Sequence, residues 1–159
     1  MKEVQLNLDK TDLKILRILQ ENAKITNLQL SQEIGLSPAP TLERVKKLEN
    51  ARLIQGYHAE INQEAVGIGI RAIIQITLTR QIENAISSFK KEINKIPEIM
   101  ECYQVTGSAD YILIVMLKDI RDFEALISQK LSKMEEIGQM QTMMILSKIK
   151  DSKVLPLNY

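Results

Sequence analysis

The sequence contains one cysteine, Cys102, and one histidine, His58, in 159 residues. A single cysteine cannot form an internal disulfide or a cysteine-based metal site, and the alternating pattern around Cys102 predicts a buried or half-buried strand residue. His58 stands next to a tyrosine, where a histidine more often packs than acts as a base or ligand. The sequence also lacks a nucleophile–base constellation, a metal-ligand cluster and a glycine-rich phosphate loop, which disfavours an enzyme.

Long apolar runs and a strong net charge are also missing. No uninterrupted apolar segment is long enough to span a membrane, and Lys2 and Glu3 precede no continuous apolar core, so we expect a cytoplasmic protein with no secretory signal. The formal net charge is +1, with nine Lys or Arg and eight Asp or Glu in residues 1–60. Binding to a polyanion would therefore depend on a local basic patch, used in more than one copy.

Residues 26–56 contain the signals for two short helices around a tight turn. Thr26 and Gln29 fit a capping box at the start of the first helix. Gly35 suits the left-handed position that ends a helix, and Ser37 followed by Pro38 suits the N-cap and first position of the next. This spacing predicts a helix-turn-helix, a motif that places its second helix in the major groove of DNA.

The second helix is amphipathic and basic. Its apolar residues Leu42, Val45 and Leu48 recur at helical spacing and are predicted to face inward. In a helix-turn-helix the N-terminal residues of this helix reach base edges, and lysines further along meet phosphates. Glu43 either accepts from a cytosine amine or pairs with a neighbouring lysine. The predicted DNA-binding residues are Ser37, Pro38, Ala39, Pro40, Thr41, Glu43, Arg44, Lys46 and Lys47.

Signals on either side of this motif set the predicted domain boundaries. Asp9, with Asp12 three residues later, predicts the N-terminus of a first helix that runs to about Asn22. After the motif, residues 53–61 suggest short extended segments that form a wing or a hinge, and Gly67 and Gly69 mark a loop. We therefore expect a DNA-binding domain over 1–60, a linker over 61–69 and a second domain over 70–159.

In the second domain the sequence predicts strands and helices in the order βαββαβ. Alternating residues predict strands at 71–79, 100–106 and 111–117, the last two forming a hairpin across 107–110. Helical periodicity appears at 84–96 and again after Asp119, and Gly138 precedes a final methionine-rich strand. This order predicts an α+β protein whose second domain is ferredoxin-like, with helices on one face of an antiparallel sheet. The other face needs a cover, which a second subunit would supply.

Several segments, in order, resemble the Lrp/AsnC (leucine-responsive, feast/famine) transcriptional regulators over essentially the whole chain. The resemblance implies a winged helix-turn-helix head and a ferredoxin-like domain that dimerises and often assembles further into octamers. It also implies a small effector, commonly an amino acid, and no other cofactor. The segments that carry the resemblance are 8–12 with 15–16, 35–40, 44–49, 54–57 and 105–111.

The resemblance places the effector at an interface between dimers, close to the hairpin loop. Glycine in this loop permits close backbone approach, loop amides would bind a carboxylate, and Asp110 would meet an α-ammonium group. Alternatively, the loop is only a turn that Asp110 caps. The predicted effector-binding residues are Tyr103, Gln104, Thr106, Gly107, Ser108 and Asp110.

Two positions depart from the family pattern. Arg52 stands where such proteins commonly have glycine, so either it adopts a positive φ or the helix exit differs. Ser108 follows the loop glycine where relatives often carry an acidic residue. Two other functions also remain open: an enzyme with a fused DNA-binding head, and an architectural DNA binder that senses no effector.

Overall fold

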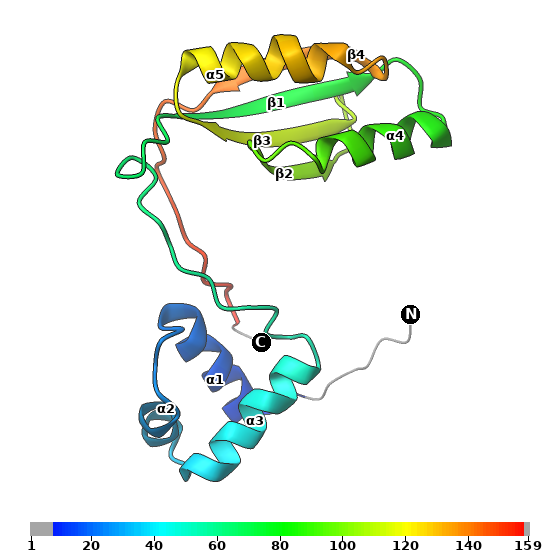
Figure 1. The fold of residues 1–159 in the computed structure, drawn as a ribbon. Helices are drawn as coiled ribbons and strands as arrows, with labels where there is room; N and C mark the ends of the chain where they lie inside the picture. Colours follow the sequence, from blue (N-terminus) through cyan, green and yellow to red (C-terminus); the bar gives the residue numbers. More distant parts are fainter. Residues whose placement is uncertain (1–7, 158–159) are drawn as a thin grey trace. The chain divides into compact units, whose positions relative to one another are not determined.

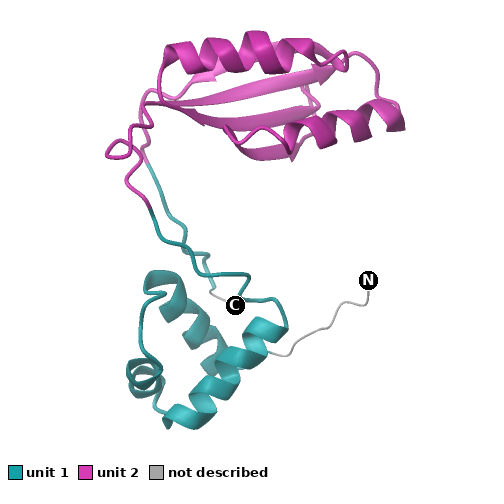
Figure 2. Cartoon of the chain, in the orientation of Figure 1, with its two compact units in different colours: residues 1–60, 150–159 teal, residues 61–149 magenta. Residues whose placement is uncertain are grey.

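The computed structural model describes residues 8–157, which divide into two compact units (Figure 2). Unit 1 contains residues 8–60 and 150–157, and unit 2 contains residues 61–149. The predicted second domain ran from 70 to 159, whereas the structure groups its last described residues with unit 1. The reason is hydrogen bonding to the first helix of unit 1, where the Leu155 N–H donates to Gln20 Oε1 at 2.6 Å.

Unit 1 is a bundle of three helices: α1 (Lys10–Glu21), α2 (Asn27–Ile34) and α3 (Pro38–Asn50) (Figure 1). The two predicted capping boxes are present, at Asp9 and at Thr26, each with its side chain bonded to the backbone three residues on. One buried side chain from each helix forms the centre of the core, and burial of these apolar side chains holds the bundle together. These are Ile15, Leu30 and Leu48, all at most 3% exposed.

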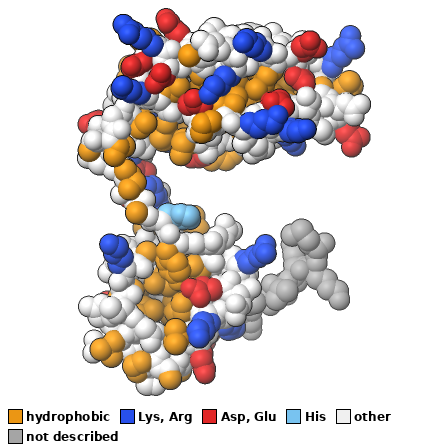
Figure 3. Space-filling model, in the orientation of Figure 1, with side chains coloured by type: hydrophobic (Ala, Val, Ile, Leu, Met, Phe, Trp, Pro, Cys, Tyr) orange, Lys and Arg blue, Asp and Glu red, His pale blue; other side chains and the backbone are white. Residues whose placement is uncertain are grey.

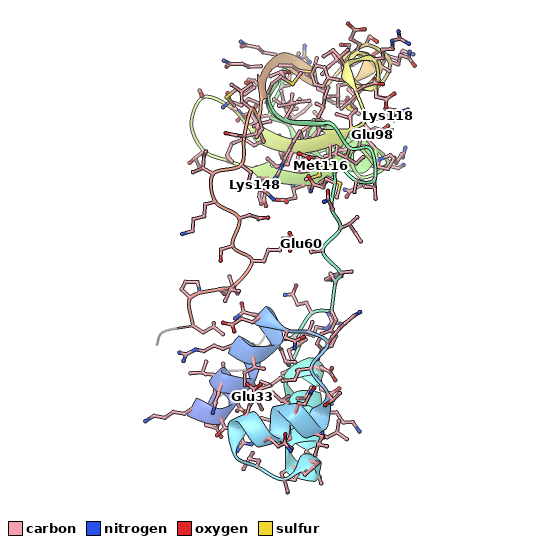
Figure 4. The ribbon with its side chains drawn as sticks, turned by 90° about the vertical axis from the view of Figure 1, so that its left-hand side faces the viewer. Glu33, Glu60, Glu98, Met116, Lys118 and Lys148 are labelled. Carbon is pink, nitrogen blue, oxygen red and sulfur yellow. The ribbon has the colours of Figure 1, made fainter. Side chains whose placement is uncertain are left out.

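The connection between α2 and α3 has the predicted form. Gly35 ends α2 in the left-handed conformation at φ 73°, which glycine adopts without steric strain. Asn27, at the start of α2, donates from Nδ2 to the carbonyl of Pro38 at 2.8 Å and so joins the starts of the two helices. Lys14 of α1 donates to the carbonyl of Glu33, labelled in Figure 4, near the end of α2.

Unit 2 contains one four-stranded antiparallel sheet. Its strands are β1 (Ile70–Leu78), β2 (Ile99–Gln104), β3 (Tyr111–Leu117) and β4 (Ile137–Met144), arranged in the order β2-β3-β1-β4. With helix α4 (Glu83–Ile93) after β1 and α5 (Ile120–Ala125) after β3, the chain order is βαββαβ. The predicted ferredoxin-like arrangement is therefore confirmed.

The two faces of this sheet differ. Alternate residues of β1 and β3, such as Ile74 and Leu113, are fully buried against the helices in one core with Phe89 and Leu126. The residues between them point to the opposite face, where they are only half-buried. Apolar members of that open face are Ile73, Ile112, Ile114, Met116 and Met143.

The helix after β3 changes its winding before it ends. After α5 comes a π-helical turn, η1 (Leu126–Lys130), and then a 3₁₀ turn, η2 (Leu131–Lys133). Lys130 donates from Nζ to both carboxylate oxygens of Glu98, at 2.7 and 2.8 Å, and this hydrogen-bonded ammonium lowers the pKa of Glu98. Glu98 also accepts at its carbonyl from the N–H of Met116, labelled beside it in Figure 4. The Lys130–Glu98 pair therefore ties the end of this helix to the residue that precedes edge strand β2.

Residues 53–61, where a wing or a hinge was predicted, form no strand. Glu60, labelled in Figure 4, pairs with Lys153 at 3.1 Å within unit 1.

No helix in residues 8–157 is both long and apolar enough to cross a bilayer.

Candidate DNA-reading surface and effector pocket

The orientation of α3 about its own axis decides which side chains are available to a ligand. Thr41 and Leu48 are completely buried, whereas Leu42 is 43% exposed. The predicted inward stripe was therefore wrong at Leu42, because the helix buries Thr41 in its place. Thr41 tolerates burial since its hydroxyl donates to the carbonyl of Ser37 at 2.9 Å. Thr41 is therefore buried in this structure, and its contact with DNA stays a prediction.

The exposed side of α3 carries both apolar and charged groups. Ala39, Leu42, Glu43 and Lys46 are exposed at helical spacing, so they share one side of the helix. Ser37 and Pro38 are exposed at its start, although Ser37 caps the helix without a side-chain hydrogen bond. Figure 3 shows apolar, cationic and acidic side chains interspersed on the visible face of unit 1. We call the exposed residues 37–39, 42, 43 and 46 the reading face.

Arg44 does not belong to the reading face. Its Nη1 donates to Asp9 Oδ2 at 2.6 Å and to Asp12 Oδ1 at 2.7 Å, and the Asp12 side chain is only 1% exposed. The pKa of Asp9 is lowered first by the backbone N–H of Asp12 and then by Arg44, whose own pKa these carboxylates raise. Arg44 was predicted as a DNA-binding residue; the structure shows it in an ion pair with α1, and its contact with DNA stays a prediction.

Lys47 also lies near this cluster. Its Nζ is 3.5 Å from Asp12 Oδ2, although its side chain is 53% exposed. Pro40 is half-buried in the first turn of α3. The predicted DNA-binding residues therefore separate into exposed ones on the reading face, the cations Arg44 and Lys47 that pair with Asp12 of α1, and Pro40 and Thr41, which are half-buried and buried.

A pocket of about 280 Å³ opens in unit 2 where the β2–β3 hairpin meets the end of β1. Four of the predicted effector residues line it, and six residues that the sequence did not suggest join them. The predicted lining residues are Gln104, Thr106, Gly107 and Asp110, and the others are Leu78, Gln81, Ile86, Val105, Ala109 and Tyr111.

Asp110 connects the elements around this pocket. Its Oδ2 accepts from the backbone N–H of Leu78 at 2.8 Å, and its Oδ1 accepts from Gln81 Nε2 at 2.6 Å. The backbone N–H of Asp110 also donates to the carbonyl of Ile76 at 2.9 Å. The carboxylate therefore fixes the hairpin to the end of β1, while each oxygen keeps a further acceptor position.

Tyr111 contributes a buried polar group. It is 2% exposed, and its ring centroid lies 4.7 Å from that of Phe89. Its hydroxyl oxygen is buried without a hydrogen-bond partner in the described chain, and burial raises the pKa of this phenol. A polar ligand that enters the pocket would find this hydroxyl available.

The remaining predicted effector residues lie outside the pocket lining. Tyr103 is 52% exposed and its hydroxyl donates to Glu101. Ser108 is exposed, and its carbonyl accepts from Thr77 Oγ1 at 3.4 Å. Gly107, by contrast, does line the pocket; it has φ 120° with open space where a Cβ would stand, so its backbone conformation, rather than close packing, requires glycine.

Three of the pocket residues missed from the sequence come from elements other than the hairpin. Leu78 ends β1 and Gln81 follows it, and both reach the hairpin through the β1–β3 pairing. Tyr111 carried a usable signal, because it alternates with Leu113 and Val115 along its strand and therefore shares their buried face. Ile86 comes from α4 and gave no such signal.

Comparison with known proteins matches both units. Residues 71–155 match the Lrp/AsnC ligand binding domain, and residues 8–55 match a winged helix-turn-helix DNA-binding domain. The chain belongs to the Lrp/AsnC family. This Lrp/AsnC protein is therefore a DNA-binding transcriptional regulator, and the alternative of an enzyme with a fused DNA-binding head is set aside.

Relatives cover almost the whole of this Lrp/AsnC chain. The leucine-responsive regulatory protein of Haemophilus influenzae is 37% identical over 150 residues, covering 94% of this chain and 90% of that protein. The transcriptional regulator AzlB of Bacillus subtilis is 38% identical over 151 residues, covering 95% and 96%. A Neisseria meningitidis regulator crystallised with L-Met superposes with a TM-score of 0.91 at 37% identity, covering 95% and 97%.

Proposed function

We propose that this regulator reads duplex DNA with the reading face of α3, and that a small amino acid bound beside Asp110 changes its assembly and DNA affinity. The observation that carries the sensing part is the pocket itself, with an anchored carboxylate, a buried free hydroxyl and apolar walls. The exposure of α3 supports the DNA-reading part.

Each residue of the reading face has a contact suited to its chemistry. Ser37, Pro38 and Ala39 stand at the N-terminal end of α3, the end that approaches base edges in a helix-turn-helix. Leu42 offers an apolar contact for the methyl group of thymine, and Glu43 accepts from the amine of cytosine. Lys46 contacts phosphate, which strengthens binding to any sequence.

The pocket suits an amino acid with an apolar side chain. Its volume of about 280 Å³ lies just below the range of about 300–1,000 Å³ typical of ligand sites, which suits a small ligand. Asp110 would bind the ammonium group, and the hydroxyl of Tyr111 would donate to the carboxylate. Leu78, Ile86 and Val105 would contain the side chain. Because the Neisseria relative was crystallised with L-Met, methionine is the first probe.

A second copy of the chain would cover the open face of the sheet. On this face Ile73, Ile112, Ile114 and Met116 are only half-buried and Met143 is exposed, and a second sheet would remove them from water. We expect a cytoplasmic homodimer that assembles further, to an octamer or a related oligomer. An effector that binds one of these assemblies more tightly than the other shifts the equilibrium toward it, and the size of the shift is set by the difference between the two affinities.

The test separates ligand recognition from turn capping by means of two substitutions of Asp110. Asp110→Asn keeps an oxygen for the Leu78 N–H, and the Gln81 amide can rotate to accept from the new amide, so the hairpin stays anchored. Asp110→Ala removes both bonds. Calorimetric titration with methionine, leucine and glutamate measures effector binding, and anisotropy of a labelled duplex measures DNA affinity in parallel.

We expect wild type to bind methionine or leucine, and Asp110→Asn to lose at least tenfold in ligand affinity with unchanged effector-free DNA binding. Normal ligand binding by Asp110→Asn would show that this carboxylate is a structural cap only. If wild type bound none of the amino acids while its DNA affinity was intact, the protein would be an architectural binder.

A further inference from the structure

Arg52, directly after α3, has an unusual backbone conformation. It is the one non-glycine residue among those described with a positive φ, at 56°. A side chain with a β-carbon is disfavoured in this left-handed region because the β-carbon crowds the backbone carbonyl. Such outliers often mark functional positions, so the role of this side chain is worth establishing.

The hydrogen bonds at the end of α3 explain the backbone but not the side chain. The N–H of Arg52 donates to the carbonyl of Glu49 at 2.8 Å, and the N–H of Leu53 donates to that of Leu48 at 3.0 Å. With Ala51 as C-cap, these two bonds form a Schellman motif. In this motif the residue after the C-cap, here Arg52, is left-handed and is usually glycine. The motif therefore requires the conformation, and glycine would satisfy it without strain.

No side-chain contact of Arg52 within residues 8–157 compensates for the strain. The Arg52 side chain is exposed and has no hydrogen bond or ion pair with any residue in 8–157. It lines a surface groove of about 760 Å³ at the end of α3, together with Glu43, Lys46, Lys47 and Asn50. Two of these residues, Glu43 and Lys46, belong to the reading face, so the groove continues that surface.

We propose that Arg52 binds a phosphate of the DNA backbone at the C-terminal end of α3. The guanidinium presents a planar fork of donors that matches phosphate oxygens, and it stands beside two further cations. A recognition helix directs its N-terminal residues to base edges, and in a homeodomain its C-terminal end contacts the backbone. This proposal rests on α3 being the DNA-reading helix.

Three substitutions separate charge from strain. Arg52→Gly removes both, Arg52→Gln removes the charge and keeps the β-carbon, and Arg52→Lys keeps the charge without the fork. Arg121→Gln, an exposed residue of α5, is the control for net charge, and Lys46→Gln tests the reading face. The full-length variants are titrated with a labelled mixed-sequence duplex of about 30 base pairs across about 50 to 200 mM salt, the range in which phosphate contacts dominate.

For each copy of unit 1 bound to DNA, the loss of one phosphate contact reduces the magnitude of the slope of log affinity against log salt concentration by about 0.9. We expect this reduction for Arg52→Gly and Arg52→Gln, and an unchanged slope for Arg52→Lys and Arg121→Gln. Arg52→Gly should also melt at a higher temperature than Arg52→Gln, because only glycine relieves the strain. Together these results would show that the strain is retained for the sake of a DNA contact.

The outcomes distinguish this proposal from the one on which it rests. If Lys46→Gln weakens binding while Arg52→Gly binds with wild-type affinity and slope, α3 reads DNA and the role given to Arg52 is wrong. If neither substitution changes affinity or slope, α3 is not the reading helix, and both proposals fail.

Discussion

At the scale of single residues, a buried carboxylate decides the role of Arg44. Asp12 is almost inaccessible to water, and a buried charge without a partner is strongly destabilising. Arg44 supplies that partner from α3, and Lys47 supplies a weaker one at 3.5 Å. Arg44, which the sequence predicted as a DNA-binding residue, joins two helices of unit 1.

Arg44→Ala is therefore expected to lower the free energy of unfolding of unit 1 by about 1 to 3 kcal/mol, the range for leaving a buried acceptor unsatisfied. This loss of stability is smaller than the loss expected on breaking a fully buried ion pair, because Arg44 is about one-third exposed and Lys47 remains nearby. Chemical denaturation measures the change, with Lys46→Ala as the exposed control. Unchanged stability together with relaxed DNA sequence preference would restore Arg44 as a base contact.

Residue-level prediction from the sequence succeeded where one residue type fits one backbone conformation. The capping boxes at Asp9 and Thr26 and the left-handed Gly35 are found where their spacing predicted. It failed on Thr41 and Leu42, because hydrophobicity alone assigned the leucine to the core. The hydroxyl of Thr41 bonds to its own helix, which makes its burial inexpensive, and no local pattern reveals this.

At the scale of elements, the sheet of unit 2 has one covered and one open face. The alternation along β1 and β3 predicted both faces, and α4 and α5 cover the expected one. The π-helical turn was not predicted, since a change of winding leaves the residue pattern nearly unaltered. The pocket was predicted only in part for a related reason: its far wall comes from residues that long-range strand pairing brings to the hairpin.

The open face leads to a prediction about assembly. Ile114→Lys places a charge in the middle of that face and should weaken self-association by about ten- to a hundredfold, since burial of one isoleucine contributes about 1.5 to 3 kcal/mol. Ile120→Lys is the matched control, because Ile120 is 53% exposed on α5. Sedimentation velocity measures the association, and circular dichroism checks folding. Equal association of both variants would exclude this face as the dimer contact.

At the scale of the whole molecule, the chain leaves unit 1 after Glu60 and re-enters it at residue 150. The returning segment is held by hydrogen bonds from Leu155 to Gln20 and from Arg17 to Leu157, and by the Lys153–Glu60 pair. The predicted domain boundaries did not anticipate this return, because residues 150–157 carry no periodic pattern that assigns them to a helix or a strand.

Ending the chain after Ile149 should destabilise unit 1 and leave unit 2 unchanged. Each hydrogen bond of the returning segment is exposed and contributes at most about 0.5 to 1.5 kcal/mol to the stability of unit 1. In a domain this small, a loss of about 1 kcal/mol lowers the melting temperature by roughly 4 to 8 °C. Calorimetry of the truncated chain, compared with Lys153→Ala, measures the shift, and effector titration checks unit 2. An unchanged transition for unit 1 would show that the returning segment contributes nothing to its stability.

The return also has a consequence for how the protein can be dissected. In connectivity, unit 2 is an insertion within unit 1, because both ends of the described chain belong to unit 1. A protease that cleaves after Glu60 leaves unit 2 covalently joined only to residues 150–157, which hydrogen bonds and the Lys153–Glu60 pair hold against unit 1. A cut at residue 150 instead leaves unit 2 joined to the helices of unit 1, so the two single cuts give different nicked molecules. A fluorophore attached near residue 8 or residue 157 reports on unit 1, and a probe of the effector pocket has to be attached within residues 61–149.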